Sequence, residues 1–322
     1  MTARSGFARV NPPESMVTLL ERQDPRNPFA TWPYAMARGR LGESVVLVGD
    51  GSAGPLALGF ERTGWMRRVL EIPSIPVTSG DSEFWKRLYQ VAATRGLTRI
   101  ELNSYGAIGA RLPSDLEFER RWTRMEHVLD LGGGDLLAGC HRTHRQRVRQ
   151  AIKAGAAVEW RRDPSALADH ARLITASVER RHGAGRVTPS VATSLHAELI
   201  GTGSGEIAQV RLGGEVVAST LVLRAADGGY LHSSGSSAEG KSVGAHHFMV
   251  IEIAGRLRDE GRSVLNLGGT RGDEVGLRSF KNHFGAEAIE AEAGTIDTDR
   301  LAARLGAAAS TVLSRLRRAG GA

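Results

Sequence analysis

Residues 206–234, with the sequence EIAQVRLGGEVVASTLVLRAADGGYLHSS, decide the fold class of this chain. Two runs rich in aliphatic and β-branched residues flank Gly213 and Gly214, a pattern that predicts a β-hairpin. The turn at residues 227–229 leads into a third strand at residues 230–234. A helical pattern at residues 243–259 and a strand at residues 264–267 follow, so the segment predicts a mixed α/β unit.

The same order of elements occurs earlier in the chain. Residues 44–48 and 55–60 predict a hairpin, residues 67–72 a third strand, residues 81–95 a helix and residues 100–102 a fourth strand. Gly96 aligns with Gly261 and Ile100 with Leu265, both at a separation of 165 residues. Internal repetition of this kind indicates a duplicated unit.

We therefore predict an α/β (α+β) protein with mixed sheets and two tandem domains of similar plan. The first spans residues 1–130, of which residues 1–30 are expected to be irregular, and the second spans residues 131–298. Residues 299–322 are expected to form a basic amphipathic helix. A helix is also predicted from about Leu136 to Ala154, with Cys140, Val148 and Ile152 on its apolar face.

Composition excludes several classes of protein. With 41% hydrophobic and 24% charged residues, the chain of 322 residues can bury a core. The single cysteine excludes a disulfide framework and a multi-cysteine zinc site and favours a reducing compartment. No apolar run is long enough to span a membrane, and the N-terminus lacks the pattern of a signal peptide. We expect a cytoplasmic protein with neither a metal site nor a resident cofactor.

One glycine motif resembles a nucleotide-binding fingerprint but has the wrong context. Gly49, Gly51 and Gly54 have the spacing of the dinucleotide-binding loop. That loop requires a helix immediately afterwards, whereas here Pro55 and a second strand follow. A hairpin turn is therefore the better interpretation.

Positive charge is concentrated in one segment. The chain has a net charge of +7, and residues 142–162 contain seven cations and one anion. The cations of the helix recur at intervals of three and four residues, which places on one face Arg142, Arg145, Arg149 and Lys153. No acidic residue of the helix pairs with them, which favours a phosphate-bearing partner over a simple solvated face. Cys140 lies on the opposite, apolar face, where a lone cysteine usually behaves as a small hydrophobic residue.

A second candidate site follows the last predicted strand. Only four of the 42 Lys and Arg residues are lysines, and Lys281 is one of them. It lies between Phe280 and Phe284, after a polar loop that contains Gly268, Gly269, Arg271, Asp273 and Glu274. An ammonium held there by flanking aromatics can stabilise an oxyanion or a phosphate. The alternative is an ordinary surface lysine.

These segments resemble the FemAB-like acyltransferases of the GNAT superfamily. The resemblance rests on the basic helix at residues 141–155 and the strand after it. It continues through Tyr230 to Ser237, the segments 244–246, 266–269 and 276–277, and Phe280-Lys281 with Phe284-Gly285. It implies two GNAT-like domains and a cleft in which an acyl donor meets an amine. The first 130 residues match only in general plan.

The resemblance also implies a function and roles for particular residues. It implies a bacterial enzyme that transfers an aminoacyl group from aminoacyl-tRNA to an amine of a small-molecule or peptide-like acceptor. Lys281 of the Phe280-Lys281 pair would lie by the reacting ester. Arg142, Arg145 and Arg149, with Lys153 on the same stripe, would contact phosphates of the donor or acceptor. Apart from the resemblance, the base is expected to come either from the substrate or from Asp273 or Glu274 of the adjoining loop.

Two departures from the family pattern keep alternatives open. The chain has no charged heptad stretch for the helical arm of the cell-wall enzymes, which favours a smaller or different acceptor. Residues 240–245 also differ in spacing from the acetyl-CoA signature of ordinary GNAT enzymes. The alternatives are an acyl-CoA-dependent N-acyltransferase and a non-catalytic RNA-binding protein.

Overall fold

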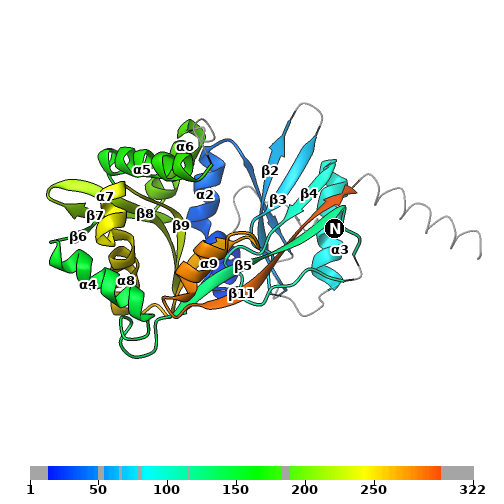
Figure 1. Ribbon diagram of the computed structural model, residues 1–322. Helices are drawn as coiled ribbons and strands as arrows, with labels where there is room; N and C mark the ends of the chain where they lie inside the picture. Colours follow the sequence, from blue (N-terminus) through cyan, green and yellow to red (C-terminus); the bar gives the residue numbers. More distant parts are fainter. Residues whose placement is uncertain are drawn as a thin grey trace, which may run out of the picture.

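The computed structural model describes residues 14–49, 54–64, 67–77, 82–114, 116–182 and 189–298 (Figure 1). Its strands form one mixed sheet of eleven strands in the order β1-β2-β3-β4-β11-β5-β10-β9-β8-β7-β6. The sequence-based prediction of an α/β protein with mixed sheets is confirmed. The two similar halves share this one sheet, and the boundary predicted near residue 130 stays a prediction.

The N-terminal half forms one end of the sheet. Strands β1 (Ser44–Val48), β2 (Ala57–Thr63) and β3 (Arg68–Ile72) are antiparallel neighbours. Helix α3 (Ser82–Arg95) then crosses to β4 (Arg99–Leu102), which pairs with β3 in parallel. Phe84 and Leu88 of α3 are buried against Leu70 and Ile100, so the apolar face of the helix covers this part of the sheet.

The C-terminal half repeats this plan at the other end. Strands β6 (Ala157–Arg161), β7 (Gly205–Leu212), β8 (Glu215–Ala225) and β9 (Gly228–Ser236) are antiparallel neighbours, and β10 (Val264–Thr270) pairs with β9 in parallel. The crossover contains α7 (Ala238–Val243) and α8 (Ala245–Asp259). Leu265 pairs with Gly229 just as Ile100 pairs with Leu70, so the two aligned positions are equivalent in the structure.

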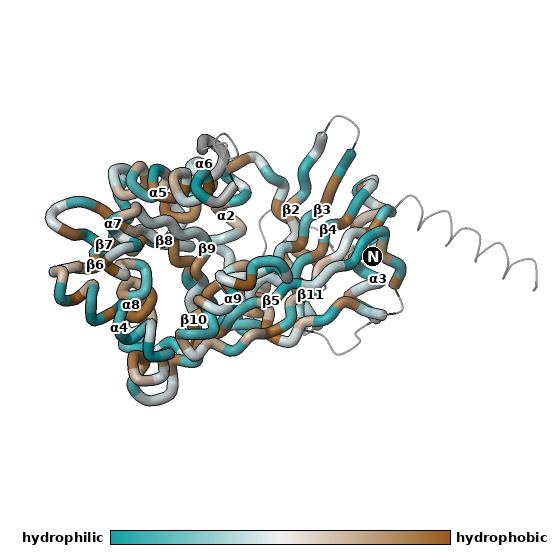
Figure 2. The backbone as a smooth tube through the Cα atoms, viewed as in Figure 1, coloured by the Kyte–Doolittle hydropathy of each residue, from teal (hydrophilic) through white to brown (hydrophobic). Residues whose placement is uncertain are grey.

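Helices cover both faces of the C-terminal half. Helices α4 (Arg142–Lys153) and α8 lie on one face, and α5 (Pro164–His182) and α6 (Pro189–Gly201) lie on the other (Figure 1). The side chains of β8 point alternately to these two faces. Val222 belongs to the core under α8, whereas Leu221 and Leu223 belong to the core under α5 and α6. Apolar segments of both halves run along these packed strands and helices (Figure 2).

Two long strands join the halves. Strand β5 (Arg120–Asp130) is antiparallel to β10 on one side and to β11 (Glu287–Asp297) on the other. Strand β11 follows helix α9 (Val275–Asn282) of the C-terminal half but also pairs with β4 of the N-terminal half. The last described strand therefore ties the two halves together.

Several local predictions were wrong or incomplete. Residues 1–30 were expected to be irregular, but α1 (Glu14–Gln23) and a short 3-10 helix (Pro28–Ala30) occur there, followed by α2 (Trp32–Arg40). The helix expected from Leu136 begins at Arg142, after His141 accepts a hydrogen bond as its N-cap. Ile152, placed on the apolar face, is 54% exposed. The helix expected at residues 299–322 lies outside the described residues.

No helix in the described part of the chain is long and apolar enough to cross a membrane.

Candidate active site

Strands β9 and β10 diverge in the middle of the sheet and open a cleft. They pair only between residues 228–230 and 264–266. Beyond that point a cleft of about 1590 Å³ opens, lined by residues 231–236 of β9 and 267–270 of β10. Each strand carries a register shift at the opening: β9 against β8, with His232 as the extra residue, and β10 against β5 between Asn266 and Gly269. Such bulges redirect side chains and end strand pairing.

The equivalent strands of the N-terminal half stay closed. Asn103 N donates to Ile72 O, and Ile75 N donates to Asn103 O, both at 2.8 Å. Ser74 and Ser104 extend the contact as an isolated bridge. Because these backbone groups satisfy one another, the described residues leave an open fork only in the C-terminal half.

Lys281 lies at the mouth of the open fork. Its side chain is 7% exposed, and its Nζ donates a hydrogen bond to Gly269 O at 2.8 Å. Burial lowers the pKa of Lys281 to about 8, while the charges of Glu126 and Glu274 act in the opposite direction. An ammonium has three donors, and Gly269 O accepts from only one of them. The remaining donors find no acceptor among the described residues, so they are available to a substrate oxygen in the cleft.

A buried carboxylate holds the base of the fork together. Glu126 of β5 accepts hydrogen bonds from Gly106 N at 3.0 Å, Asn266 Nδ2 at 2.7 Å and Tyr230 OH at 3.1 Å. Arg124 also pairs with it. These donors come from the loop after β4 and from β10, β9 and β5, so Glu126 links both halves directly beside the fork. Glu126 was not among the predicted site residues.

Aromatic rings form the wall behind Lys281. Phe280 packs at ring-centroid distances of 5.0 Å from His247, 5.1 Å from His144 and 5.1 Å from Phe284. His144 Nε2 also contacts Phe280 O at 2.9 Å. Desolvation lowers the pKa of His247 to about 3 and that of His246 to about 4, so this wall is uncharged at neutral pH.

The N-terminus of α8 supplies positive potential to the same cleft. Gly244 precedes it with φ 81° and without a side-chain cap. The first N–H groups of a helix lack partners within the helix and attract anions. Arg147 and Lys241 line the cleft nearby, and Arg147 Nη1 donates to Ser242 O at 3.1 Å. A Cβ at Gly244 would lie 2.6 Å from Arg147 O, which explains the glycine.

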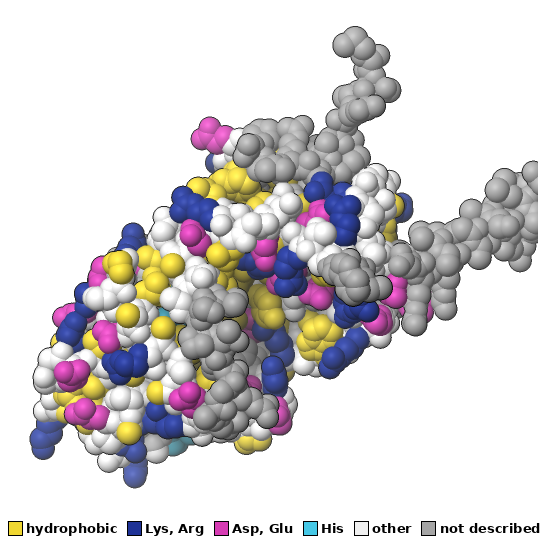
Figure 3. Space-filling model, turned by 90° about the horizontal axis from the view of Figure 1, so that it is seen from above, with side chains coloured by type: hydrophobic (Ala, Val, Ile, Leu, Met, Phe, Trp, Pro, Cys, Tyr) yellow, Lys and Arg dark blue, Asp and Glu magenta, His cyan; other side chains and the backbone are white. Residues whose placement is uncertain are grey.

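The predicted phosphate-contacting stripe lies outside the cleft. Arg142, Arg149 and Lys153 are exposed on the outer side of α4, and Arg145 donates to Ala138 O at 3.2 Å and to Cys140 O at 2.6 Å. Arg147, which was not part of that stripe, is the cation of α4 that reaches the cleft. Seen from above, basic and acidic side chains are interspersed over both halves (Figure 3).

The other predicted site residues do line the cleft. The structure brings Phe280, Lys281 and Phe284 together with the loop residues Gly268, Gly269, Arg271, Asp273 and Glu274. Glu274 Oε2 accepts a hydrogen bond from Arg271 N at 2.8 Å, which orders the loop before α9. Cys140 is buried, and desolvation raises the pKa of its thiol to about 11, so it is not a thiolate nucleophile.

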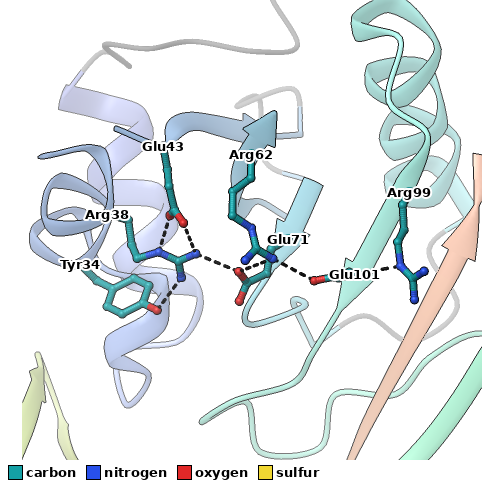
Figure 4. Close-up of polar contacts among 7 residues, drawn as sticks. All are labelled: Tyr34, Arg38, Glu43, Arg62, Glu71, Arg99 and Glu101. Atoms are coloured by element: carbon teal, nitrogen blue, oxygen red, sulfur yellow. Dashed lines mark hydrogen bonds and ion pairs between the residues drawn. The ribbon is translucent and has the colours of Figure 1, made fainter. Parts of the chain in front are cut away.

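A second arm of the cleft reaches the N-terminal half. Arg38 of α2 donates to Glu71 at 2.8 Å and to Tyr34 OH at 3.1 Å, and it also pairs with Glu43 (Figure 4). Arg62 extends this network from Glu71 to Glu101. The hydroxyl-bearing residues 233, 234 and 236 of β9 line the same cleft. This arm offers hydrogen-bonding groups rather than an apolar surface. The described residues contain no cluster of ligands for a metal ion.

The comparisons with known proteins fit this geometry. Residues 139–282 match the model of the acetyltransferase (GNAT) domain family. These residues span the basic helix, the fork and Lys281, so this part of the chain is similar to a GNAT acetyltransferase domain. No curated protein matches the sequence.

Solved structures extend the likeness to both halves. FemX has a TM-score of 0.65 at 16% identity and covers 85% of this chain and 95% of its own. The L-PGS of Bacillus licheniformis has a TM-score of 0.55 at 16% identity, over 90% and 93% of the two chains. A tandem GNAT protein of the clavulanic acid biosynthesis pathway has a TM-score of 0.54 at 12% identity, over 88% and 94%. These likenesses show a fold of two GNAT-like units, as the resemblance implied.

Proposed function

We propose that the chain transfers an aminoacyl group from aminoacyl-tRNA to an amine of a small-molecule or peptide-like acceptor, with formation of an amide bond. The observation that carries this proposal is the buried ammonium of Lys281 at the mouth of the open fork. The FemAB-like resemblance supports this role, because it implies that the lysine of the Phe280-Lys281 pair lies beside the reacting ester.

The reaction requires little beyond alignment and charge stabilisation. The acceptor nitrogen attacks the ester carbonyl, and a tetrahedral oxyanion forms. The C–O bond to the ribose then breaks, the ribose oxygen gains a proton and the amine loses one. Lys281 stabilises the oxyanion or the departing ribose oxygen through its free N–H donors. Since the ester is already activated, positioning in the cleft contributes up to roughly 7–11 kcal/mol in favourable cases.

Each arm of the cleft suits one substrate. The N-terminus of α8 with Arg147 and Lys241 suits a phosphate of the donor, because helix N-termini and arginines bind phosphate well. The arm with Arg38, Glu71 and the serines of β9 suits a polar acceptor. The base that receives the amine proton is assigned to Asp273 or Glu274, which both line the cleft beside Lys281.

An acyl-CoA donor is the second candidate, and one observation favours it. The first turn of α8 has no side-chain cap and contributes His246 and His247 to the lining of the cleft. Despite the altered spacing of residues 240–245, such a helix N-terminus suits a pyrophosphate as well as an RNA phosphate. The match of residues 139–282 to an acetyltransferase domain family supports an enzyme over the non-catalytic RNA-binding alternative.

A donor competition experiment tests the proposal. The protein is incubated with a pool of charged tRNA or with acyl-CoA, each with an extract of small amines and peptides, and new amides are identified by mass. We expect products from charged tRNA alone. Products that form only from acyl-CoA would replace this proposal with the second candidate.

A further inference from the structure

One stretch of β5 lies open along the cleft. Strand β10 ends with the pair Thr270–Met125, whereas β11 continues along β5 as far as Arg120. Among the described residues, positions 120–124 of β5 therefore have no strand partner on the side where β10 ends. Arg120, Trp122, Thr123 and Arg124 line the cleft there.

The side chains of this open stretch are basic and aromatic. Trp122 is 37% exposed and belongs to none of the hydrophobic cores. The guanidinium of Arg120 lies 5.3 Å from the centroid of the Trp122 rings. Arg124 stacks over Tyr105 at 3.7 Å. The contacts with Tyr105 and Glu126 thus give Arg124 a structural role, whereas no such role is evident for the exposed face of Trp122.

Two arginines that line the same cleft as this indole carry unpaired charge within the described part of the chain. Within the described residues, Arg120 and Arg271 form no ion pair, and both line the cleft. Arginines beside an exposed aromatic ring are the combination that binds single-stranded nucleic acid, because bases stack on the ring and cations neutralise phosphates. A peptide strand would use the open backbone edge but would gain nothing from two free guanidinium groups.

The row of side chains leads to the reaction centre. Alternate residues of a strand point to the same face, so Arg120, Trp122, Arg124 and Glu126 form one row. Trp122 and Glu126 are four steps apart along the strand, which corresponds to about 13 Å. A base at Trp122 is therefore within a nucleotide or two of an ester at Lys281.

We propose that Trp122 is a stacking platform for a base of the single-stranded 3′ end of the donor RNA, with Arg120 and Arg271 beside the adjoining phosphates. This inference rests on the proposed function, because it assigns the path by which an aminoacyl-tRNA enters the fork. The folded body of the tRNA lies outside this site.

Binding of a short RNA tests the platform without any turnover. The probe is an uncharged RNA hairpin with a single-stranded CCA end and a fluorescent label, and anisotropy gives its affinity for each variant. Stacking contributes about 1–3 kcal/mol per base, so Trp122→Ala is expected to weaken binding roughly 5- to 150-fold. Trp122→Phe keeps a ring and is expected to retain most of the affinity.

The chain offers a matched control for the loss of an indole. Trp160 of β6 also packs against an arginine, with the Arg256 guanidinium 4.0 Å from the centroid of its rings, but it does not line the cleft. Trp160→Phe is expected to leave RNA affinity unchanged. Unfolding curves of all variants show whether a loss of binding reflects a loss of folding.

Each outcome supports or overturns the inference. Equal affinity of wild type and Trp122→Ala for the hairpin, or no binding by either, overturns it. Displacement of the RNA by CoA or by a peptide acceptor, with the same dependence on Trp122, overturns it in favour of that ligand.

Amide formation from charged tRNA tests the proposed function separately from RNA binding. Product from charged tRNA with an unchanged KM in Trp122→Ala refutes the platform and leaves the function standing. Trp122-dependent RNA binding without any product from charged tRNA supports the platform and refutes the function.

Discussion

Replacement of Gly268 by alanine tests whether the shape of the fork matters for the reaction. Gly268 has φ 79°, a region that residues with a Cβ enter only at a cost of about 1–2 kcal/mol. A Cβ there would lie 3.1 Å from Leu231 O on the opposite strand and 3.6 Å from the Lys281 Nζ. The first distance requires the fork to widen by a few tenths of an ångström.

Gly155 provides a control for the backbone strain alone. It has φ 80°, and a Cβ there would meet no atom within 4 Å. Both replacements also reduce the freedom of the unfolded chain equally, so that contribution cancels in the comparison. We expect Gly155→Ala to lower the free energy of unfolding by at most about 1–2 kcal/mol. Gly268→Ala is expected to lose about 1 kcal/mol more, because it crowds a packed backbone.

Urea unfolding and steady-state kinetics with the same donor measure the two effects. A displacement of about 1 Å in a catalytic group can cost about 100-fold, so we expect kcat/KM of Gly268→Ala to fall at least about tenfold. Gly155→Ala is expected to keep the wild-type value. The reasoning fails if Gly268→Ala retains full activity, or if both variants lose activity equally.

Three further predictions concern charge. Since the pKa of Lys281 is about 8, the ammonium is lost as the pH rises through about 8, and kcat/KM should fall there; a profile that stays flat up to pH 10 would exclude an ammonium mechanism. Burial lowers the pKa of five histidines and keeps them neutral in the folded state. Their contribution to the free energy of unfolding is therefore fully present above pH 6.5 and is lost as the pH falls toward about 4. Calorimetry in buffers of different ionisation enthalpy should therefore detect uptake of about five protons on unfolding at pH 5, and uptake of one or none would contradict it; the residues are His170, His196, His232, His246 and His247. Arg147→Glu should raise the KM for the donor at least about tenfold and flatten its salt dependence, whereas Arg149→Glu on the outer side of α4 should change it much less; equal effects would place the donor on the outer stripe.

The repeated plan could be predicted because its signals are local. The turn at Gly213-Gly214 fixes a hairpin from adjacent residues, and the alignment of Ile100 with Leu265 needs only sequence separation. The cleft loop and Lys281 were found in the same way, from a lysine between two phenylalanines. The observed parallel pairs of β3 with β4 and of β9 with β10 agree with this prediction.

The remaining features depend on contacts between distant segments. Strand β11 pairs with β4 across almost 200 residues of sequence, and no local pattern predicts that pairing. Glu126 gains its role from donors on three other segments. Arg147 lines the cleft and Arg149 does not, because one particular side of α4 faces α8. The spacing of the cations alone does not determine which side that is.

Single-turnover transfer from aminoacyl-tRNA by lysine variants tests the central claim most directly. Lys281→Met removes the ammonium at the fork, and Lys153→Met removes an exposed lysine of α4 as a matched control. The account predicts that wild type and Lys153→Met form the amide at the same rate, while Lys281→Met is folded and slower by at least about 100-fold. Transfer by Lys281→Met at the wild-type rate would contradict it.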